Sequence, residues 1–228
     1  MIKSVTFKKN FRCFDKDDKF DLRPGVNVLV GDQGTGKSTL IELIRSKLDN
    51  TKHSESDSSY RAKSIMVHDK IDDLIEINMD KATKCIAYDF ERESARDMSA
   101  IHFDMFAEQM SAMKASHGQG NNISMARILD KVSKQKDKVD VILFDEPDAA
   151  MSPRSCYSLL IILNSIAEKW KKQVIVSSHN PIIINGFHPV MKKEFQQMWT
   201  EVLSMEDKMW MKSSDFMIFQ LLDYRKKS

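Results

Sequence analysis

The chain of 228 residues has few cysteines, no long hydrophobic run and little excess of either charge. Its three cysteines, Cys13, Cys85 and Cys156, are far apart and odd in number, which disfavours a disulfide framework or a zinc cluster and favours reduced thiols. No apolar run approaches the ~20 residues that a membrane-spanning helix needs. The opening MIKSVTFKKN lacks the hydrophobic core of a signal peptide, so we expect a cytoplasmic protein with no membrane span.

The charges are nearly balanced, with 35 Lys and Arg against 33 Asp and Glu. The net charge of +2 does not predict nucleic-acid binding, although it is compatible with a local basic patch. Hydrophobic residues make up 42% of the chain, which excludes bulk disorder. The length predicts one large domain, or one domain with a small appendage. No internal repeat is visible.

Strands and helices are predicted to alternate along the chain. Apolar alternation or short apolar runs predict strands at 2–7, 20–22, 26–30, 64–67, 74–77, 84–89, 141–144 and 173–177. Helical spacing predicts helices at 38–48, 104–115, 123–132 and 153–170, and a mostly helical tail from 190 to 228. This alternation favours an α/β fold with a largely parallel sheet.

A glycine-rich loop is the strongest motif. The segment fits G-x-x-x-x-G-K-[ST] and consists of Gly31, Asp32, Gln33, Gly34, Thr35, Gly36, Lys37 and Ser38. Glycines let backbone N–H groups surround a phosphate, and the following helix directs its N-terminus at that phosphate. Lys37 would reach the β- and γ-phosphates, and the Ser38 hydroxyl would bind Mg²⁺. A fortuitous glycine turn is disfavoured, because an apolar strand precedes the loop and an amphipathic helix follows it.

Two further strands are predicted to end in polar residues. The run VILF is followed by Asp145 and Glu146, which suit Mg²⁺ coordination and activation of an attacking water, respectively. Acidic residues after a strand are also common as simple turns, and the upstream phosphate loop favours the catalytic interpretation. The run QVIVS is followed by His179, which would hydrogen-bond a γ-phosphate and orient the water.

In this order the motifs resemble those of the ABC-type ATPase heads. More narrowly, they resemble the soluble branch related to the SMC and RecF proteins and to small AAA-type ATPases of bacteria and phages. The matching segments are a Walker A loop at 31–38, a signature motif at 115–119 (ASHGQ), Walker B at 141–147, a D-loop at 148–153 and a switch-histidine loop at 177–179. The segment 10–14 (NFRCF) is similar to the N-F-R segment of RecF-like and SMC-like proteins, which adds Arg12 to the expected nucleotide contacts.

The resemblance implies a P-loop NTPase with a mostly parallel sheet core and a small antiparallel β and helical subdomain. Residues 1–190 would form the ATPase domain, with a helical signature-bearing segment at about 90–135, and 191–228 a helical C-terminal extension packed on it. ABC heads form homodimers head to tail around two ATP molecules with Mg²⁺. Each site would use Lys37, Thr39, Glu146 and His179 of one subunit, and Ser116, Gly118 and Gln119 of the other.

Four features depart from the family pattern. His117 replaces a glycine of the commonest signature motif, and Ser152 stands where many D-loops have aspartate. The Q-loop glutamine is not apparent, and Asp89, Glu91 or Gln109 could substitute for it. The interval between the Walker A loop and the signature motif has no sustained heptad repeat and no room for a coiled-coil arm, which predicts a compact head.

Three functions are compatible with these motifs. The first is a soluble ATPase that drives a conformational switch on DNA or a partner protein, in DNA metabolism, phage biology or defence. Basic clusters at 169–172, 192–193 and 225–227 could contact DNA phosphates, although solvated helix ends are the favoured interpretation of each. The alternatives are the nucleotide-binding subunit of a membrane transporter and a slow ATP-dependent switch whose methionine-rich segment 98–113 binds a partner. Short length and absent arms are compatible with a phage or mobile-element origin.

Overall fold

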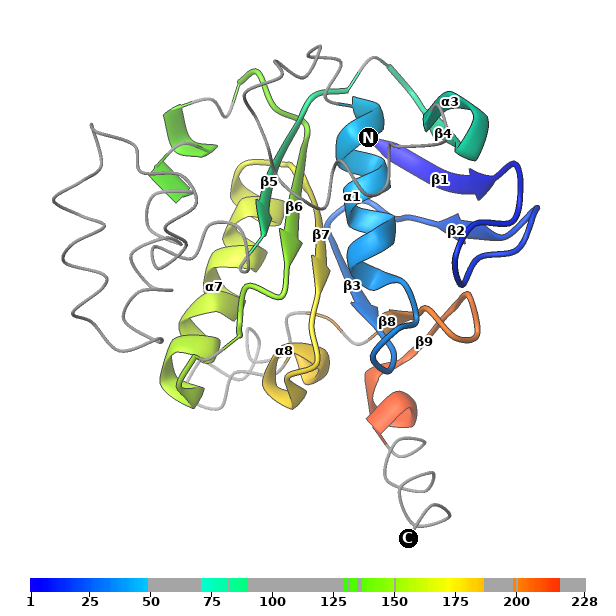
Figure 1. The fold of residues 1–228 in the computed structure, drawn as a ribbon. Helices are drawn as coiled ribbons and strands as arrows, with labels where there is room; N and C mark the ends of the chain where they lie inside the picture. Colours follow the sequence, from blue (N-terminus) through cyan, green and yellow to red (C-terminus); the bar gives the residue numbers. More distant parts are fainter. Residues whose placement is uncertain are drawn as a thin grey trace, which may run out of the picture.

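A computed structural model of the chain describes residues 1–48, 71–81, 83–89, 129–130, 132–134, 137–149, 151–186, 199 and 201–217. Its centre is a six-stranded sheet (Figure 1). The strands lie in the order β5 (Cys85–Asp89), β6 (Val141–Asp145), β7 (Gln173–Ser177), β3 (Val26–Val30), β8 (Glu201–Ser204) and β9 (Met209–Lys212). All neighbouring strands pair in parallel, except that β8 and β9 are antiparallel to each other. The predicted α/β fold with a mostly parallel sheet is therefore confirmed.

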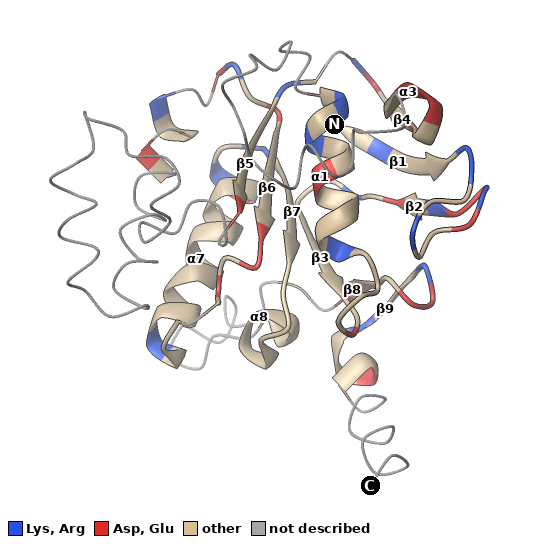
Figure 2. Ribbon diagram, viewed as in Figure 1, with Lys and Arg blue, Asp and Glu red and all other residues tan. Residues whose placement is uncertain are grey.

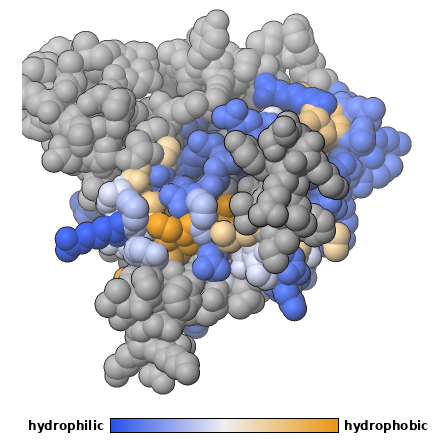
Figure 3. Space-filling model, turned by 90° about the horizontal axis from the view of Figure 1, so that it is seen from below, coloured by the Kyte–Doolittle hydropathy of each residue, from blue (hydrophilic) through white to orange (hydrophobic). Residues whose placement is uncertain are grey.

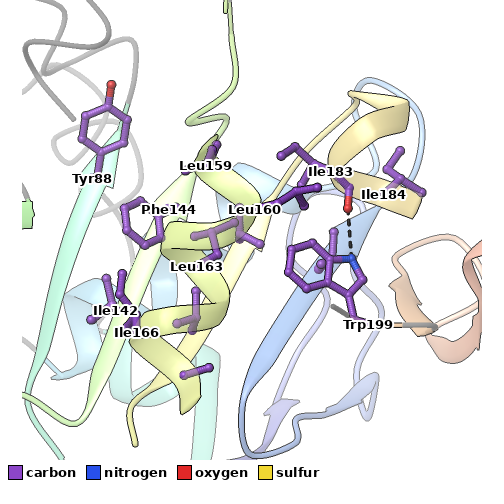
Figure 4. Packing of buried hydrophobic residues seen from close by; sticks show 14 of the residues in the cluster. Tyr88, Ile142, Phe144, Leu159, Leu160, Leu163, Ile166, Ile183, Ile184 and Trp199 are labelled. Atoms are coloured by element: carbon purple, nitrogen blue, oxygen red, sulfur yellow. Dashed lines mark hydrogen bonds between the residues drawn. The ribbon is translucent and has the colours of Figure 1, made fainter. Parts of the chain in front are cut away.

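Helices cover both faces of this sheet. In β6, Ile142 and Phe144 belong to the hydrophobic cluster that includes α7 (Pro153–Lys169), and Val141 and Leu143 belong to the cluster that includes α1 (Lys37–Leu48). Successive side chains of a strand point to opposite faces, so a strand that is apolar throughout is buried on both sides. Figure 4 shows the α7 side of this packing.

The long helix α7 has clear start and packing signals. Ser152 caps its N-terminus by accepting a hydrogen bond from the Ser155 N–H, and Pro153 occupies the first turn. Leucine and isoleucine side chains spaced three and four residues apart then face the sheet, namely Leu159, Leu160, Leu163 and Ile166. The short helix α8 (Pro181–Asn185) ends at Gly186 with φ 64°, and the Trp199 indole donates to the Ile183 carbonyl beside it (Figure 4).

A second, antiparallel sheet has the order β2 (Lys19–Asp21), β1 (Ile2–Phe7) and β4 (Ile75–Met79), with α3 (Ile71–Leu74) before β4. Phe7, Phe14 and Phe20 pack ring against ring in its core. Their cluster is continuous with the α1 face of the large sheet. The predicted small antiparallel subdomain is therefore confirmed.

The tail differs from the expectation. Glu201–Ser204 and Met209–Lys212 are strands, so the predicted helical character of the tail is wrong for them. The reason is non-local: Leu203 and Ser204 pair with Leu29 and Val30 at the free edge of β3, and Val202 and Leu203 become fully buried. The boundary at residue 190 stays a prediction.

Several predicted segments lie outside the described residues. They are the strand at 64–67, the helix at 104–115 and most of the segment at 90–135, of which 129–130 and 132–134 are described and helical. Within the described parts of the chain, no helix is long and apolar enough to cross a membrane.

One buried side chain joins the two sheets. Gln173, at the start of β7, accepts from the Ile2 N–H at 2.8 Å and donates to the Ile2 and Arg23 carbonyls at 2.8 and 3.0 Å. The side chain is fully buried, and its amide group satisfies backbone N–H and carbonyl groups as a peptide group of a neighbouring strand would.

Replacing Gln173 with leucine should therefore destabilise the protein. The Ile2 N–H and carbonyl would lose a buried partner, which costs about 2–4 kcal/mol of unfolding free energy. Urea denaturation followed by circular dichroism measures this loss. Gln33→Leu, at an exposed glutamine, is the control and should change stability by less than about 0.5 kcal/mol. Equal effects of the two substitutions would contradict the joining role.

Candidate functional site

Three loops meet at one edge of the large sheet. Strand β7 lies between β6 and β3, and all three are parallel, so their carboxyl ends lie side by side. The glycine-rich loop follows β3, Glu146 follows β6, and His179 follows β7. Figure 2 shows acidic residues at the carboxyl ends of β5 and β6. Figure 3 shows this edge from below, where the described surface is largely hydrophilic around a small hydrophobic area.

The glycine-rich loop has backbone that only glycine adopts readily. Gly34 and Gly36 have φ 84° and 92°. A Cβ on Gly36 would lie 2.4 Å from the Phe14 ring and 2.6 Å from the Cys13 sulfur, so even alanine would be excluded there. Helix α1 begins directly after Gly36 and points the N–H groups of its first turn into the loop. This arrangement forms an anion-binding cradle.

Lys37 lies folded across the loop. Its ammonium donates to the carbonyls of Gly31 and Asp32 at 2.8 and 2.9 Å, and the residue is 4% exposed. Burial lowers the pKa of Lys37, and the carboxylates of Glu146 and Asp145 oppose this effect. Among the described residues, the hydrogen-bond partners of this cation are carbonyl oxygens and include no carboxylate.

A hydroxyl and a carboxylate suitable for a divalent cation lie together. Ser38 donates to Asp145 Oδ1 at 3.0 Å, and Ser177 donates to the same oxygen at 2.6 Å. Burial raises the pKa of Asp145 to about 6, although both hydrogen bonds favour the charged form. Hard oxygen ligands of this kind suit Mg²⁺. Among the described residues no group of three or more His, Cys, Asp or Glu could hold a metal, so the cation would also need water and phosphate oxygens.

Glu146 and His179 face the same space. Glu146 has φ 46°, a sparsely populated conformation for this residue type, and its N–H donates to Ser177 Oγ at 2.9 Å. His179 Nε2 lies 3.6 Å from Glu146 Oε1, too far for a hydrogen bond, and the two side chains are 40% and 43% exposed. Burial, with a contribution from Lys37, lowers the pKa of His179, so the imidazole is neutral at pH 7.

A pocket of about 290 Å³ joins these groups. Its lining comprises Arg12, Cys13, Gln33, Gly34, Gly36, Lys37, Ser38, Thr39, Glu146 and His179. Arg12 and Cys13 enter it from a tight turn in which Phe11 and Phe14 exchange backbone hydrogen bonds. Arg12 has φ 55° and donates to Thr39 Oγ1 at 3.1 Å.

The structure thus brings together the predicted residues of the Walker A loop, the acidic strand end and the histidine loop. Ser116, Gly118 and Gln119 lie outside the described residues, as do Glu91 and Gln109. Asp89 is in register with Asp145 on the neighbouring strand and contributes to its raised pKa. Sequence reasoning did not identify Cys13 as a pocket residue, although its place next to Arg12 in the NFRCF segment was a signal.

The chain is similar to several known proteins. The sequence pattern of the AAA domain family matches residues 9–224. The Hemin import ATP-binding protein HmuV of Methylobacillus flagellatus is 23% identical over 192 residues, which are 72% of this chain and 68% of that protein. A protein of Bacillus cereus described as an ABC transporter ATP-binding protein is 23% identical over 187 residues, and the match spans only 32% of its length.

The solved structure of cbiO1 from Clostridium perfringens, part of the ABC transporter complex cbiONQ, shares the fold with a TM-score of 0.51. The two chains are 13% identical, and the match covers 98% of this chain and 94% of that one. Because the family pattern spans nearly the whole chain and the phosphate loop has the geometry described above, this protein belongs to the AAA domain family of P-loop ATPases.

Proposed function

We propose that this chain binds ATP with Mg²⁺ in the pocket beside α1 and hydrolyses it to drive a conformational switch. The observation that carries the proposal is the convergence on one pocket of Lys37, of the Ser38–Asp145 pair and of Glu146 with His179. A buried cation, two oxygen ligands and a carboxylate beside a neutral imidazole are the groups that phosphoryl transfer to water requires.

Each side chain has a separate task in this proposal. The loop N–H groups and Lys37 bind the phosphates, and Lys37 offsets charge that develops on the γ-phosphate. Ser38 and Asp145 would hold Mg²⁺, which neutralises phosphate charge when bound. Glu146 accepts a proton from the attacking water, and His179, being neutral, can donate a hydrogen bond to the γ-phosphate. Arg12 and Thr39 line the pocket and would contact the nucleotide.

The half-exposed state of Glu146 and His179 supports action as a dimer. Their side chains are 43% and 40% exposed, whereas hydrolysis by a general base benefits from exclusion of bulk water. A second copy placed head to tail would cover them, and Ser116, Gly118 and Gln119 of that copy would supply donors to the γ-phosphate. ATP would then bring two chains together, and hydrolysis would release them.

The biological role has two candidates. A soluble switch acting on DNA or a partner protein fits the compact head, and the soluble SMC- and RecF-like branch remains our assignment within the family. A transporter subunit is favoured by the names of the relatives, which are ATP-binding proteins of transport systems. Stimulation of the isolated chain's ATP hydrolysis by duplex DNA would support the first role, and co-purification with a membrane protein would support the second.

Replacing Glu146 with glutamine should stop turnover without preventing ATP binding. The amide keeps the shape of the carboxylate but cannot accept the proton, so kcat should fall about 100-fold or more. An ATP-bound dimer should accumulate, because the step that separates the two chains is blocked. Phosphate release measures the first effect, and sedimentation with and without Mg-ATP measures the second.

Glu76→Gln, on the exposed side of β4, is the matched control and should hydrolyse ATP as the wild type does. Normal turnover by Glu146→Gln would exclude Glu146 as the base. If the variant is slow but stays monomeric with ATP, Glu146 would remain the proposed base, and the proposed ATP-dependent dimer would be contradicted.

The requirement for Mg²⁺ should depend on pH through Asp145. Its pKa in the free protein is raised to about 6, so the charged form that binds metal is present above this pH and is lost below it. The Mg²⁺ concentration for half-maximal hydrolysis should then rise about tenfold per pH unit below about pH 6. Ser177→Ala removes a hydrogen bond that lowers this pKa, so the rise should begin at higher pH.

Comparing the wild type with Ser177→Ala at each pH cancels the effect of the protonation of ATP itself. Ser158→Ala, at an exposed serine of α7, should follow the wild-type profile. Coincident profiles of the wild type and Ser177→Ala would show that Asp145 is not the titrating ligand.

A further inference from the structure

A buried carboxyl group beside the pocket has no task in the mechanism above. Asp148 is 8% exposed, and burial raises its pKa to about 6. Its Oδ2 accepts a hydrogen bond from Ser178 at 2.9 Å, and its Oδ1 has no partner in the described part of the chain. Burying a carboxyl group with an unsatisfied oxygen costs folding free energy, so its place between two site loops calls for a physical explanation.

The hydrogen bonds of Asp148 lead to both sides of His179. Ser178 donates to Asp148 and at the same time accepts from the Asn180 N–H at 3.0 Å. Ser178, before His179, is thus bonded to the carboxylate, and Asn180, after it, is bonded to the Ser178 hydroxyl. Asn180 is held in turn, because its side chain accepts from the Ile182 N–H at 2.9 Å and donates to the Cys156 sulfur at 3.2 Å.

The backbone turn that carries Asp148 also holds Glu146. Asp148 lies in the turn that follows Glu146, where the Ala149 N–H donates to the Glu146 carbonyl at 3.1 Å. The Met151 N–H donates to the Asp148 carbonyl at 3.0 Å, which closes the next turn. The two loops that carry Glu146 and His179 are thus joined by the bond between Asp148 and Ser178. This bond follows the Asp145–Ser177 bond, which joins the ends of the two strands.

We propose that Asp148 is a positioning residue for ATP hydrolysis: through Ser178 it holds the His179 imidazole beside Glu146. This inference rests on the proposed function. Asp148 does not line the pocket, so its removal should change the catalytic step and leave nucleotide binding almost unchanged.

Steady-state ATP hydrolysis by five variants tests the link. Asp148→Ala should lower kcat about 10- to 100-fold through a displaced histidine, with KM for ATP within about twofold of the wild type. Asp148→Asn should restore most of kcat, because its amide oxygen still accepts from Ser178. In a His179→Ala background, Asp148→Ala should have no further effect. Asp215→Ala, which removes the exposed partner of Ser214, is the matched control and should be silent.

NMR spectra of the protein without nucleotide test this inference independently of ATP hydrolysis, and so separate it from the proposed function. The imidazole signals of His179 in nitrogen–proton NMR spectra, assigned by their loss in His179→Ala, should shift in Asp148→Ala and stay in place in Asp148→Asn. Should Asp148→Ala fail to fold, Ser178→Ala breaks the same link from the other side and should give the same shift.

Unchanged His179 signals in Asp148→Ala would overturn the positioning role. It would also be overturned by an undiminished effect of Asp148→Ala in the His179→Ala background, or by an Asp148→Asn protein as slow as Asp148→Ala. A His179→Ala protein with normal turnover would instead overturn the role of His179 in the proposed function, and the NMR shift would still decide whether Asp148 holds the loop.

Discussion

The parallel pairing of β7 with β3 on one side and β6 on the other determines where every group of the site lies. Ser177 stands at the point where the three strands end, opposite Leu29 on β3 and Asp145 on β6. Its hydroxyl donates to Asp145 and accepts from the Glu146 N–H. Because side chains alternate along a strand, a slip of one residue in either pairing would turn Asp145 or Ser177 away from the pocket. The hydrophobic packing on both faces of the sheet therefore fixes the strand register that directs these side chains into the pocket.

Burial places the site in a state that favours a charged ligand. Burial lowers the pKa of Lys37 and of His179 and raises that of Asp145, so each group is shifted toward its neutral form. The phosphates of a nucleotide would stabilise the charged form of Lys37, and a divalent cation would stabilise the charged form of Asp145. Part of the desolvation cost of folding is then recovered on binding, which is the expected linkage between ligand and stability.

The sequence could predict those parts of the fold that depend on local patterns. The strand, glycine loop and helix from Val26 to Leu48 are contiguous, and the two apolar strands that end in Asp145 and Ser177 carry their polar residues next to them. Pairings between distant segments were not predictable in this way. The tail was expected to be mostly helical, yet β8 forms because the edge of β3 offers it a partner. The Asp148–Ser178 bond likewise joins residues thirty positions apart, and no local pattern indicates it.

The central claim is that the loop around Lys37 binds ATP, and calorimetric titration of Mg-ATP into the wild type and Lys37→Ala tests it most directly. Lys37 supplies the buried cation of the loop, and a charged hydrogen bond of this kind corresponds to about 10- to 100-fold in affinity. One ATP should bind per wild-type chain, and Lys37→Ala should bind at least about tenfold more weakly. Equal affinity of the two proteins, or no binding to the wild type, would contradict the account.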